Sequence, residues 1–290
     1  MKTKRLLALL LALVMMTAVF AGCGTDSTAP ADDGNTADDT AAPADGDAAE
    51  DGSLQYVLDN GALILGLDDS FPPMGYRDDN DEIIGFDIDV AAAVCEKLGV
   101  ALEVQPIDWE AKEQELNTKN IDCIWNGMSV TEERKEQLSL SIPYMENHMA
   151  LVVRPDSGIE TIADMEGKIL ALQSGSSAED ALNANEELSA AIADTNFFQD
   201  NLNALMDLET QNSDAVLMDD VVAKYLIAEG GKDLLVLNDF LYAEDYAIGF
   251  RKEDVALTEA VNDALRALKE DGTLGEIATK WFGSDTTIVA

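Results

Sequence analysis

Arg134 is the residue whose type and position most directly suggest ligand chemistry. It lies in the first turn of a helix predicted over Thr131–Gln137, where the helix dipole disfavours a cation. A guanidinium can donate to both oxygens of a carboxylate in a bidentate pair. We therefore expect Arg134 to hold a ligand carboxylate, although Glu132 and Glu133 could instead engage it in a surface ion pair.

A second position that could bind an anion is the run Ser176-Ser177-Ala178-Glu179. Its Ser-x-x-Glu pattern is that of a capping box, in which Ser176 and Glu179 satisfy backbone N–H groups at the start of a helix. A helix N-terminus also attracts anions through its free N–H groups. The pattern leaves two interpretations open, a structural cap and a ligand contact.

The few histidines and cysteines argue against the common metal and nucleophile sites. The chain has one histidine, His148, and three cysteines, so neither a His/Cys metal cluster nor a Ser-His-Asp mechanism is expected. Cys95 and Cys123 lie in apolar runs and are predicted to be buried, and their spacing does not decide whether they pair. His148 is expected in a hinge or on the surface. We expect no catalytic residue, metal or cofactor.

The N-terminus has the features of a secretory signal. Basic residues at positions 2, 4 and 5 precede an apolar run over 6–20, which is shorter than the ~20 residues that a membrane-spanning helix needs. Ala21-Gly22-Cys23 follows and resembles a lipobox. We predict a signal peptide over 1–22, lipidation at Cys23 and membrane attachment by the lipid alone. An ordinary signal peptide with a chance cysteine is the alternative.

Composition divides the remainder into a linker and a folded part. Residues 24–52 contain no Lys, Arg or aromatic residue, so the segment 23–53 is predicted to be a disordered, acidic, lipid-anchored linker. The 290-residue chain has a formal net charge of −39, which argues against a nucleic-acid partner. Residues 54–290 suffice for one large or two modest α/β domains.

Within that folded part, short apolar strands alternate with helices. The predicted strands are 62–67, 100–107, 121–125, 150–153, 169–172, 215–218, 234–237 and 247–250. The predicted helices are 85–98, 110–118, 131–137, 257–269 and 274–281, with a hairpin near 78–81. This alternation predicts an α/β fold with parallel sheets covered on both faces. Ligands bind beyond the carboxyl ends of strands in such sheets.

Several short motifs follow one another along the folded part. They are GLDDSFPPMGY at 66–76, GFDID at 85–89, IDW at 107–109, GMSVTEER at 127–134, QSGSS at 173–177, DGTL at 271–274 and KWFG at 280–283. Together they resemble the polar amino-acid-binding proteins of ABC importers, which are extracellular solute-binding proteins of family 3. The similarity extends over about 54–283.

The resemblance implies a two-lobed periplasmic-binding-protein type II fold with two crossover hinge strands. Lobe 1 would comprise 54–146 plus 247–290, and lobe 2 would comprise 147–246, with hinges near 144–148 and 242–246. It also implies an extracytoplasmic, lipid-anchored monomer that captures a free polar amino acid and delivers it to an ABC permease with its ATPase. An amino-acid sensor without transport, or a dehydratase or lyase on the same fold, are the alternatives.

The same resemblance implies roles at the main-chain end of an amino acid. Arg134 would bind the carboxylate, and Ser129 would add a backbone donor. The turn at Ser176 and Ser177 would face the carboxylate as well. The resemblance therefore favours a ligand contact at that turn, and a structural cap remains open as the other interpretation.

Asp219 ends the apolar strand 215–218 and matches the family carboxylate that holds the α-ammonium group. The Gly127 carbonyl would face the same ammonium. A solvated turn aspartate is the alternative for Asp219, and the neighbouring Asp220 is its rival for the role.

The ligand side chain is expected to meet aromatic rings and one acid. Phe71 and Trp109 match the family positions whose rings sandwich the ligand, although aromatic residues also fill cores. Asp68 could reach the far end of the side chain and favour Lys, Arg or an amide. The sequence does not choose between glutamine, cystine and a basic amino acid.

Overall fold

The computed structural model of the protein describes residues 51–290. The predicted signal peptide over 1–22, the lipidation at Cys23 and nearly all of the predicted linker over 23–53 lie outside these residues. Within the described part, no helix combines the length and the apolar character that crossing a membrane requires.

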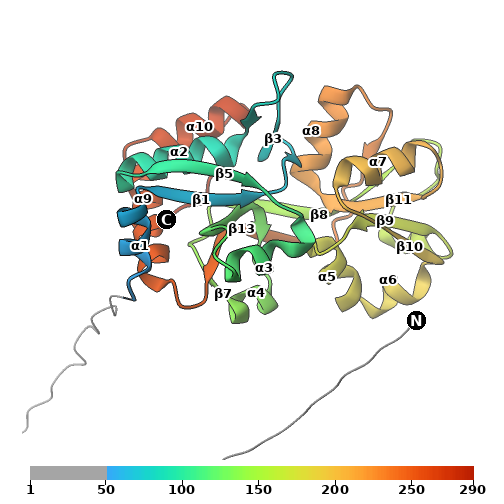
Figure 1. Cartoon of the computed structure of the whole chain (residues 1–290). Coiled ribbons are helices and arrows are strands. Elements are labelled where there is room, and N and C mark those ends of the chain that lie inside the picture. Colours follow the sequence, from blue (N-terminus) through green and yellow to red (C-terminus); the bar gives the residue numbers. More distant parts are fainter. Residues whose placement is uncertain (1–50) are drawn as a thin grey trace, which may run out of the picture. The chain divides into compact units, whose positions relative to one another are not determined.

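A ten-stranded sheet runs through the whole folded part (Figure 1). Eight strands follow one another in the order β10-β9-β11-β8-β13-β6-β1-β5, while β12 pairs with β8 and β7 pairs with β13. The strands are β1 (Ala62–Leu67), β5 (Ala101–Pro106), β6 (Cys123–Ser129), β7 (Leu138–Leu140), β8 (Met145–Val153), β9 (Ile169–Gln173), β10 (Asp194–Phe198), β11 (Ala215–Asp219), β12 (Leu235–Val236) and β13 (Tyr242–Arg251). A separate small sheet holds β2 (Ser70–Phe71), β3 (Gly75–Arg77) and β4 (Ile83–Ile84).

The sequence predicts parallel sheets, and the structure corrects this prediction. β1 is parallel to β5 and β6, and β9 is parallel to β10 and β11, but β8 and β13 are antiparallel to their neighbours. Alternation of strands and helices predicts parallel neighbours within each half. It does not reveal two long strands that carry the chain from one half to the other and back.

Helices cover the sheet at both ends of the molecule. In Figure 1, α1, α2, α9 and α10 lie around the β1–β5 end, and α5 to α8 lie around the end with β9, β10 and β11. The helices are α1 (Ser53–Asn60), α2 (Phe86–Leu98), α3 (Lys112–Asn117), α4 (Glu132–Gln137), α5 (Ser177–Ala184), α6 (Glu186–Ala191), α7 (Asn201–Glu209), α8 (Asp220–Gly230), α9 (Val255–Glu270) and α10 (Thr273–Phe282), with 3-10 turns at Trp109–Ala111 and Ile162–Met165. The result is a mixed α/β fold of two lobes, as predicted.

The first helix joins the N-terminal edge of the described part to the C-terminal region. Ala256 N donates to Asp51 Oδ2 at 2.7 Å, and Leu257 N donates to Ser53 Oγ at 3.0 Å. Two acceptors near the start of α1 thus satisfy backbone donors in the first turn of α9, where N–H groups lack helical partners. Asp51 and Ser53, which fall within the last residues of the predicted linker, therefore take part in the fold.

The two crossing strands β8 and β13 pair with each other in the middle of the sheet. Their register runs from Tyr246 opposite Met145 to Tyr242 opposite Met149. Beyond this shared stretch, β13 continues along β6 in one lobe, and β8 continues along β11 in the other. Residues at the centre of these strands therefore lie where the lobes meet.

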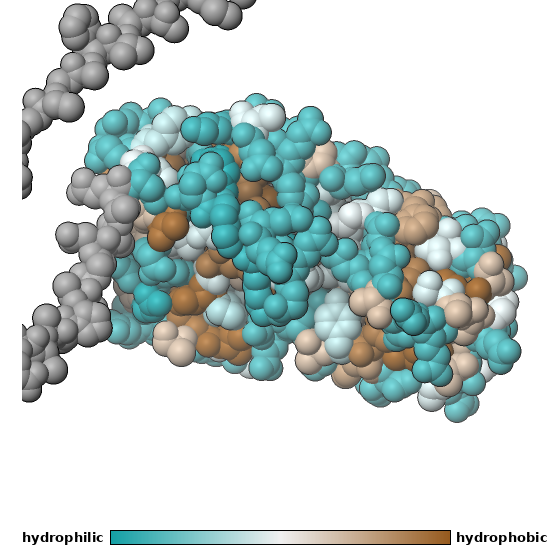
Figure 2. Space-filling model, turned by 90° about the horizontal axis from the view of Figure 1, so that it is seen from below, coloured by the Kyte–Doolittle hydropathy of each residue, from teal (hydrophilic) through white to brown (hydrophobic). Residues whose placement is uncertain are grey.

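The surface agrees with the acidic composition. On the face shown in Figure 2, hydrophilic residues form a broad band across the middle, and hydrophobic residues gather in smaller areas on either side. The apolar residues of the predicted strands are instead buried, with Leu63, Leu65 and Leu67 of β1 fully so.

Candidate ligand-binding site

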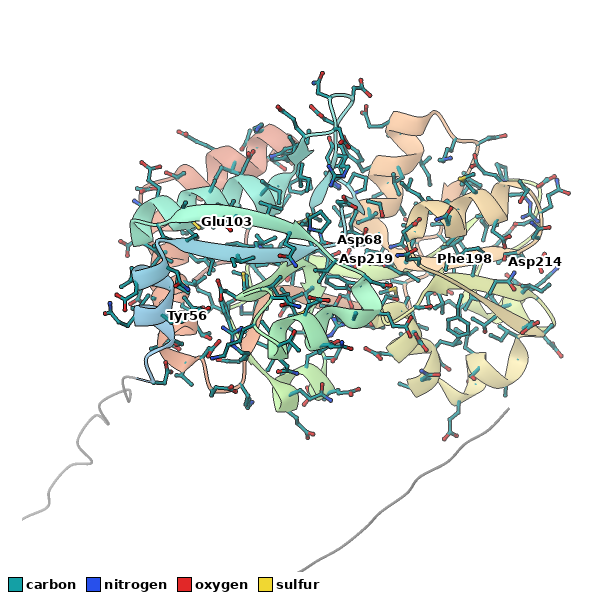
Figure 3. The ribbon with its side chains drawn as sticks, viewed as in Figure 1. Tyr56, Asp68, Glu103, Phe198, Asp214 and Asp219 are labelled. Atoms are coloured by element: carbon teal, nitrogen blue, oxygen red, sulfur yellow. The ribbon has the colours of Figure 1, made fainter. Side chains whose placement is uncertain are left out.

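A small pocket lies at the junction of the two lobes and is lined by residues of both. Asp68 and Asp219 mark its place at the centre of the molecule, while Tyr56 and Asp214 lie far out in opposite lobes (Figure 3). Eleven residues line the pocket: Asp68, Phe71, Trp109, Asn126, Gly127, Ser129, Arg134, Gln173, Ser176, Ser177 and Asp219.

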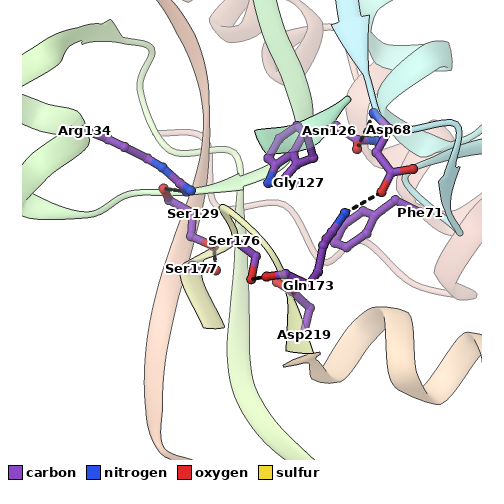
Figure 4. A pocket seen from close by; sticks show the side chains of 11 residues that line it. Asp68, Phe71, Asn126, Gly127, Ser129, Arg134, Gln173, Ser176, Ser177 and Asp219 are labelled. Atoms are coloured by element: carbon purple, nitrogen blue, oxygen red, sulfur yellow. Dashed lines mark hydrogen bonds between the residues drawn. The ribbon is translucent and has the colours of Figure 1, made fainter. Parts of the chain in front are cut away.

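All nine ligand-binding residues expected from the sequence are among these eleven (Figure 4). Two lining residues are not in the predicted ligand-binding set, Asn126 within β6 and Gln173 at the end of β9. Both are polar residues at or near the carboxyl end of a buried strand, and that position is the signal that could have identified them.

Arg134 is held in place by its own helix start. The Thr131 side chain caps α4 by accepting from Arg134 N at 3.2 Å. The guanidinium is 5% exposed, and its Nη1 donates to the Ser129 carbonyl at 2.8 Å. The nearest carboxylate in a salt bridge, Asp180, lies 4.0 Å from Nη2. Arg134 therefore reaches the pocket with much of its charge uncompensated.

The predicted capping box at Ser176 is wrong in its contacts. Ser176 is the N-cap of α5, but its side chain makes no cap hydrogen bond and donates instead to the Gln173 carbonyl at 2.7 Å. Glu179 Oε2 accepts from Gly175 N at 2.8 Å, one residue earlier than a capping box requires. The first turn of α5 thus faces the pocket without a side-chain acceptor of its own, which suits an anion.

Asp219 is a buried acid at the end of β11. Its Oδ1 accepts from the Tyr246 hydroxyl at 2.6 Å and from Asn147 Nδ2 at 2.7 Å. Desolvation by burial, followed by repulsion from Glu244, raises the pKa of Asp219 well above its usual range. A cation in the pocket would therefore stabilise the charged form of this carboxyl group.

Asp68 supplies a second acid at the opposite side of the pocket. Its Oδ1 accepts from Ser70 N and Ser70 Oγ at 2.9 and 2.6 Å, and its Oδ2 accepts from Gln173 Nε2 at 2.8 Å. Asn126 Oδ1 fixes the backbone by accepting from Asp68 N at 3.1 Å. Burial is the main cause of a raised pKa at Asp68. The contact with Gln173 joins the two lobes directly across the pocket.

Phe71, Trp109 and Gly127 shape the apolar part of the pocket. The two aromatic side chains are 6% and 7% exposed. Gly127 has a φ of +57°, and a Cβ at this position would lie 3.0 Å from the Phe71 ring and 3.1 Å from the Tyr246 ring. Only glycine combines that backbone conformation with so close an approach of two rings.

Further contacts close the two lobes over the pocket. The Ser129 and Ser177 hydroxyls lie 3.0 Å apart, and Lys112 Nζ donates to the Gly175 carbonyl at 2.8 Å. Lys112 is almost fully buried, and desolvation followed by repulsion from Arg134 lowers its pKa. The lobes therefore meet through polar groups on several sides of the pocket, and a ligand inside would be shielded from water.

Other residues that carry chemistry lie outside the pocket. Cys95 and Cys123 are both free and buried, which confirms their expected burial and answers the open question of a disulfide. His148 lies on β8 and stacks on Phe240 with 4.4 Å between ring centroids. Among residues 51–290, no group of three or more His, Cys, Asp or Glu is arranged to hold a metal ion.

Fold and pocket together define the architecture of a two-lobed solute-binding protein, with a polar pocket where the lobes meet. Residues 63–284 match the family model described as bacterial extracellular solute-binding proteins, family 3, and the chain belongs to this family. The resemblance in the sequence motifs is thereby confirmed.

Named relatives bind different amino acids. The L-cystine-binding protein TcyJ of Escherichia coli (strain K12) is 30% identical over 241 residues, covering 82% of this chain and 89% of that protein. The arginine-binding extracellular protein ArtP of Bacillus subtilis (strain 168) is 33% identical over 224 residues, covering 76% and 86%. A solved ABC uptake transporter substrate-binding protein from Streptococcus pneumoniae with bound histidine is 41% identical, with a TM-score of 0.80, covering 82% of this chain and 98% of that chain.

Proposed function

We propose that this protein captures a free polar amino acid in the pocket between its lobes. The observation that carries the proposal is a buried guanidinium from one lobe and a buried carboxylate from the other, Arg134 and Asp219, lining one small pocket. A zwitterion needs a group of each sign, and Arg134 would take its carboxylate while Asp219 takes its ammonium.

Backbone groups would complete recognition of the main-chain end. The uncapped first turn of α5 at Ser176 and Ser177 suits the carboxylate, as does a backbone donor at Ser129. The Gly127 carbonyl would accept from the ammonium. These groups are shared by all amino acids, so they would give affinity without selecting a side chain.

Selection would come from the other side of the pocket. Phe71 and Trp109 would pack on the side chain, and Asp68 would accept a hydrogen bond from its far end. Gln173 already donates to Asp68 at 2.8 Å, so a ligand donor would replace or join that contact. This chemistry favours a side chain that carries a hydrogen-bond donor, as basic amino acids and glutamine do.

Binding would be coupled to closure because the contacts come from both lobes. We assign residues 54–146 plus 247–290 to lobe 1 and 147–246 to lobe 2, with hinges near 144–148 and 242–246. A ligand that touches both lobes binds the closed form better than the open form and shifts the equilibrium towards it.

The closed form would deliver its amino acid to an ABC permease with its ATPase. The protein would act as an extracytoplasmic monomer, anchored to the membrane by lipid at Cys23 after removal of residues 1–22. Replacement of the lipidated cysteine tests the anchor: Cys23→Ala should move the protein from the membrane fraction to the soluble fraction without changing its ligand affinity. Retention of Cys23→Ala protein in washed membranes would disprove lipid anchoring at this residue.

A thermal-shift screen of the purified protein against the twenty amino acids and L-cystine tests the binding function. We expect a rise in Tm with at least one of them, because a ligand that binds only the folded state stabilises it. Arg134→Ala should lower the affinity for that amino acid by ~30-fold or more, as expected when one partner of a buried charge pair is removed.

Lys135→Ala is the matched control. Lys135 follows Arg134 on the same helix, but it is exposed and pairs with Glu132 on the surface at 2.7 Å. Its removal should leave the ligand-induced Tm shift unchanged. A full Tm shift in Arg134→Ala, or no shift with any amino acid in the wild type, would overturn the proposed function.

A further inference from the structure

Two buried carboxyl groups lie side by side at the inner edge of the pocket. Asp219 and Glu244 are 6% and 7% exposed. One nitrogen, Asn147 Nδ2, donates to Asp219 Oδ1 at 2.7 Å and to Glu244 Oε1 at 2.6 Å. An amide nitrogen has two hydrogens, so Asn147 can satisfy one oxygen of each acid and hold them together.

The pairing of neighbouring strands places these acids together. β8 lies between β11 and β13, with Met149 of β8 opposite Asp219 and Asn147 of β8 opposite Glu244. The amide and both acids therefore sit on three adjacent hydrogen-bonded strands. Because strand pairing holds the acids, their proximity does not depend on contact between the lobes.

The surroundings supply hydrogen bonds but little positive charge. Tyr246 donates to Asp219, and Ser129 Oγ donates to Glu244 Oε1 at 2.7 Å. Among residues 51–290, neither acid takes part in a salt bridge. The other charged or titratable groups nearby are Tyr242, Asp220, Lys224, His148, Arg134, Tyr144, and the residues Lys135, Glu146 and Asp245 that line a surface cavity with Glu244. Of these, Lys135 pairs on the surface with Glu132 at 2.7 Å.

The cations in this set are engaged elsewhere. Lys224 forms its ion pair with Asp220, His148 Nδ1 lies 3.7 Å from Asp220, and Arg134 donates to the Ser129 carbonyl. Two adjacent, buried and uncompensated carboxylates are costly, so such a pair retains a proton. The raised pKa of Asp219 has this cause in part, since repulsion from Glu244 follows desolvation as its origin.

We propose that Glu244 sets the charge of the ligand site: this neighbouring acid keeps Asp219 protonated when no ligand is bound, and an incoming ammonium group displaces that proton. The O–H bond of Asp219 breaks and the proton goes to solvent. The carboxylate that remains balances the charge of the bound cation. The proposal rests on the proposed function, because it takes Asp219 as the partner of the ammonium.

Glu244 is thus a positioning residue for charge, because it acts on the ligand through Asp219 and does not itself line the pocket. It makes affinity depend on pH in a defined direction. Since binding releases a proton, affinity rises with pH and falls by up to ~10-fold per pH unit below the pKa of Asp219.

Calorimetry in two buffers tests the proposal. L-Arginine is the first probe, because neither its guanidinium nor its amine titrates near pH 7, with L-glutamine and L-cystine as further probes. Titrations at pH 7 in phosphate and in Tris, which differ in ionisation enthalpy, report the protons released. We expect a net release of protons on binding in the wild type, to a limit of one per bound ligand. Glu244→Gln keeps the acceptor for Asn147 and should abolish both the release and the pH dependence between pH 6 and 8.

Glu146→Gln is the matched control, because Glu146 is an exposed acid on β8, the crossing strand that pairs with the strand of Glu244. It should release protons as the wild type does. Binding of a probe by the wild type with equal enthalpy in both buffers would overturn the proposal while leaving the binding function intact, even if Glu244→Gln fails to fold. Unchanged proton release in Glu244→Gln would also overturn it. Absence of any binding would overturn both.

Discussion

Arg134 and Arg251 are buried to nearly the same extent, but they meet very different surroundings. Arg251 lies at the end of β13, with its Nε 2.6 Å from Asp254 Oδ2 and its Nη2 3.5 Å from Asp122 Oδ1. Its Nη1 also donates to the carbonyls of Leu116 and Ile121 at 3.0 and 2.8 Å. Arg134 has one carbonyl and one carboxylate at the limit of contact.

The different partners of the two arginines distinguish a charged residue that stabilises the fold from one that can bind a ligand. A buried guanidinium with two carboxylates and two carbonyls is neutralised within the chain. Its removal therefore lowers the stability of the folded state. A buried guanidinium that lines a pocket without such partners is available for an external anion. The two arginines therefore predict opposite phenotypes for the same kind of substitution.

The largest expected effect is the loss of stability in Arg251→Met. Removing the cation leaves Asp122 and Asp254 buried without their partner, and such a break costs ~3–5 kcal/mol of unfolding free energy. Urea unfolding would measure the loss, and calorimetry on the folded fraction should show unchanged ligand affinity. In Arg134→Ala, by contrast, affinity should fall while the unfolding free energy stays within ~1 kcal/mol of the wild type.

Neutralising Asp122 and Asp254 tests whether buried charge causes the loss of stability in Arg251→Met. Arg251→Met combined with Asp122→Asn and Asp254→Asn should recover a large part of the stability, because no uncompensated charge remains buried. If the triple variant were no more stable than Arg251→Met, the cost would come from packing rather than charge. The contrast between the two arginines would then fail.

Sequence alone predicted the charged residues that lie next to recognisable local features. Arg134 stands out because it opposes a helix dipole, and Asp219 because it ends an apolar strand. Glu244 and Asn147 have no such signal. They are 97 residues apart in sequence and come together only because two crossing strands pair in register.

The same limit explains the errors in the fold. Most strands of the large sheet, and the helices α2, α3, α4, α9 and α10, lie near their predicted positions, because apolar runs and glycine stops are local features. The crossing strands near 144–148 and 242–246 are expected from the family resemblance, but their antiparallel pairing is not evident from the alternation of strands and helices. The direction of pairing depends on where the chain travels next. Ser176 and Glu179 also have the spacing of a capping box, but Glu179 accepts from Gly175 N, one residue before the N-cap, and the sequence pattern does not distinguish these two neighbouring donors.

Asp87 extends the comparison to an acid that has neither a cation nor a ligand. It is fully buried, and its Oδ2 accepts from Gly127 N at 2.7 Å and from the Tyr144 hydroxyl at 3.1 Å. Its Oδ1 has no hydrogen-bond partner. Burial raises the pKa of Asp87 from 3.8 to about 7. A proton thus neutralises this acid, as Arg251 neutralises Asp122 and Asp254.

The smallest expected effect is the contribution of Asp87 to the pH dependence of the unfolding free energy. Between the unfolded and folded pKa values the folded state binds more protons, so the stabilisation is complete below about pH 4 and is lost as pH rises towards 7. This group should cost ~1 kcal/mol of stability between pH 6 and 7. Urea unfolding of the wild type and Asp87→Asn across pH 5–8 would measure the difference. If that difference did not change with pH, Asp87 would be ionised throughout, and a buried acid in this protein would need neither cation nor proton.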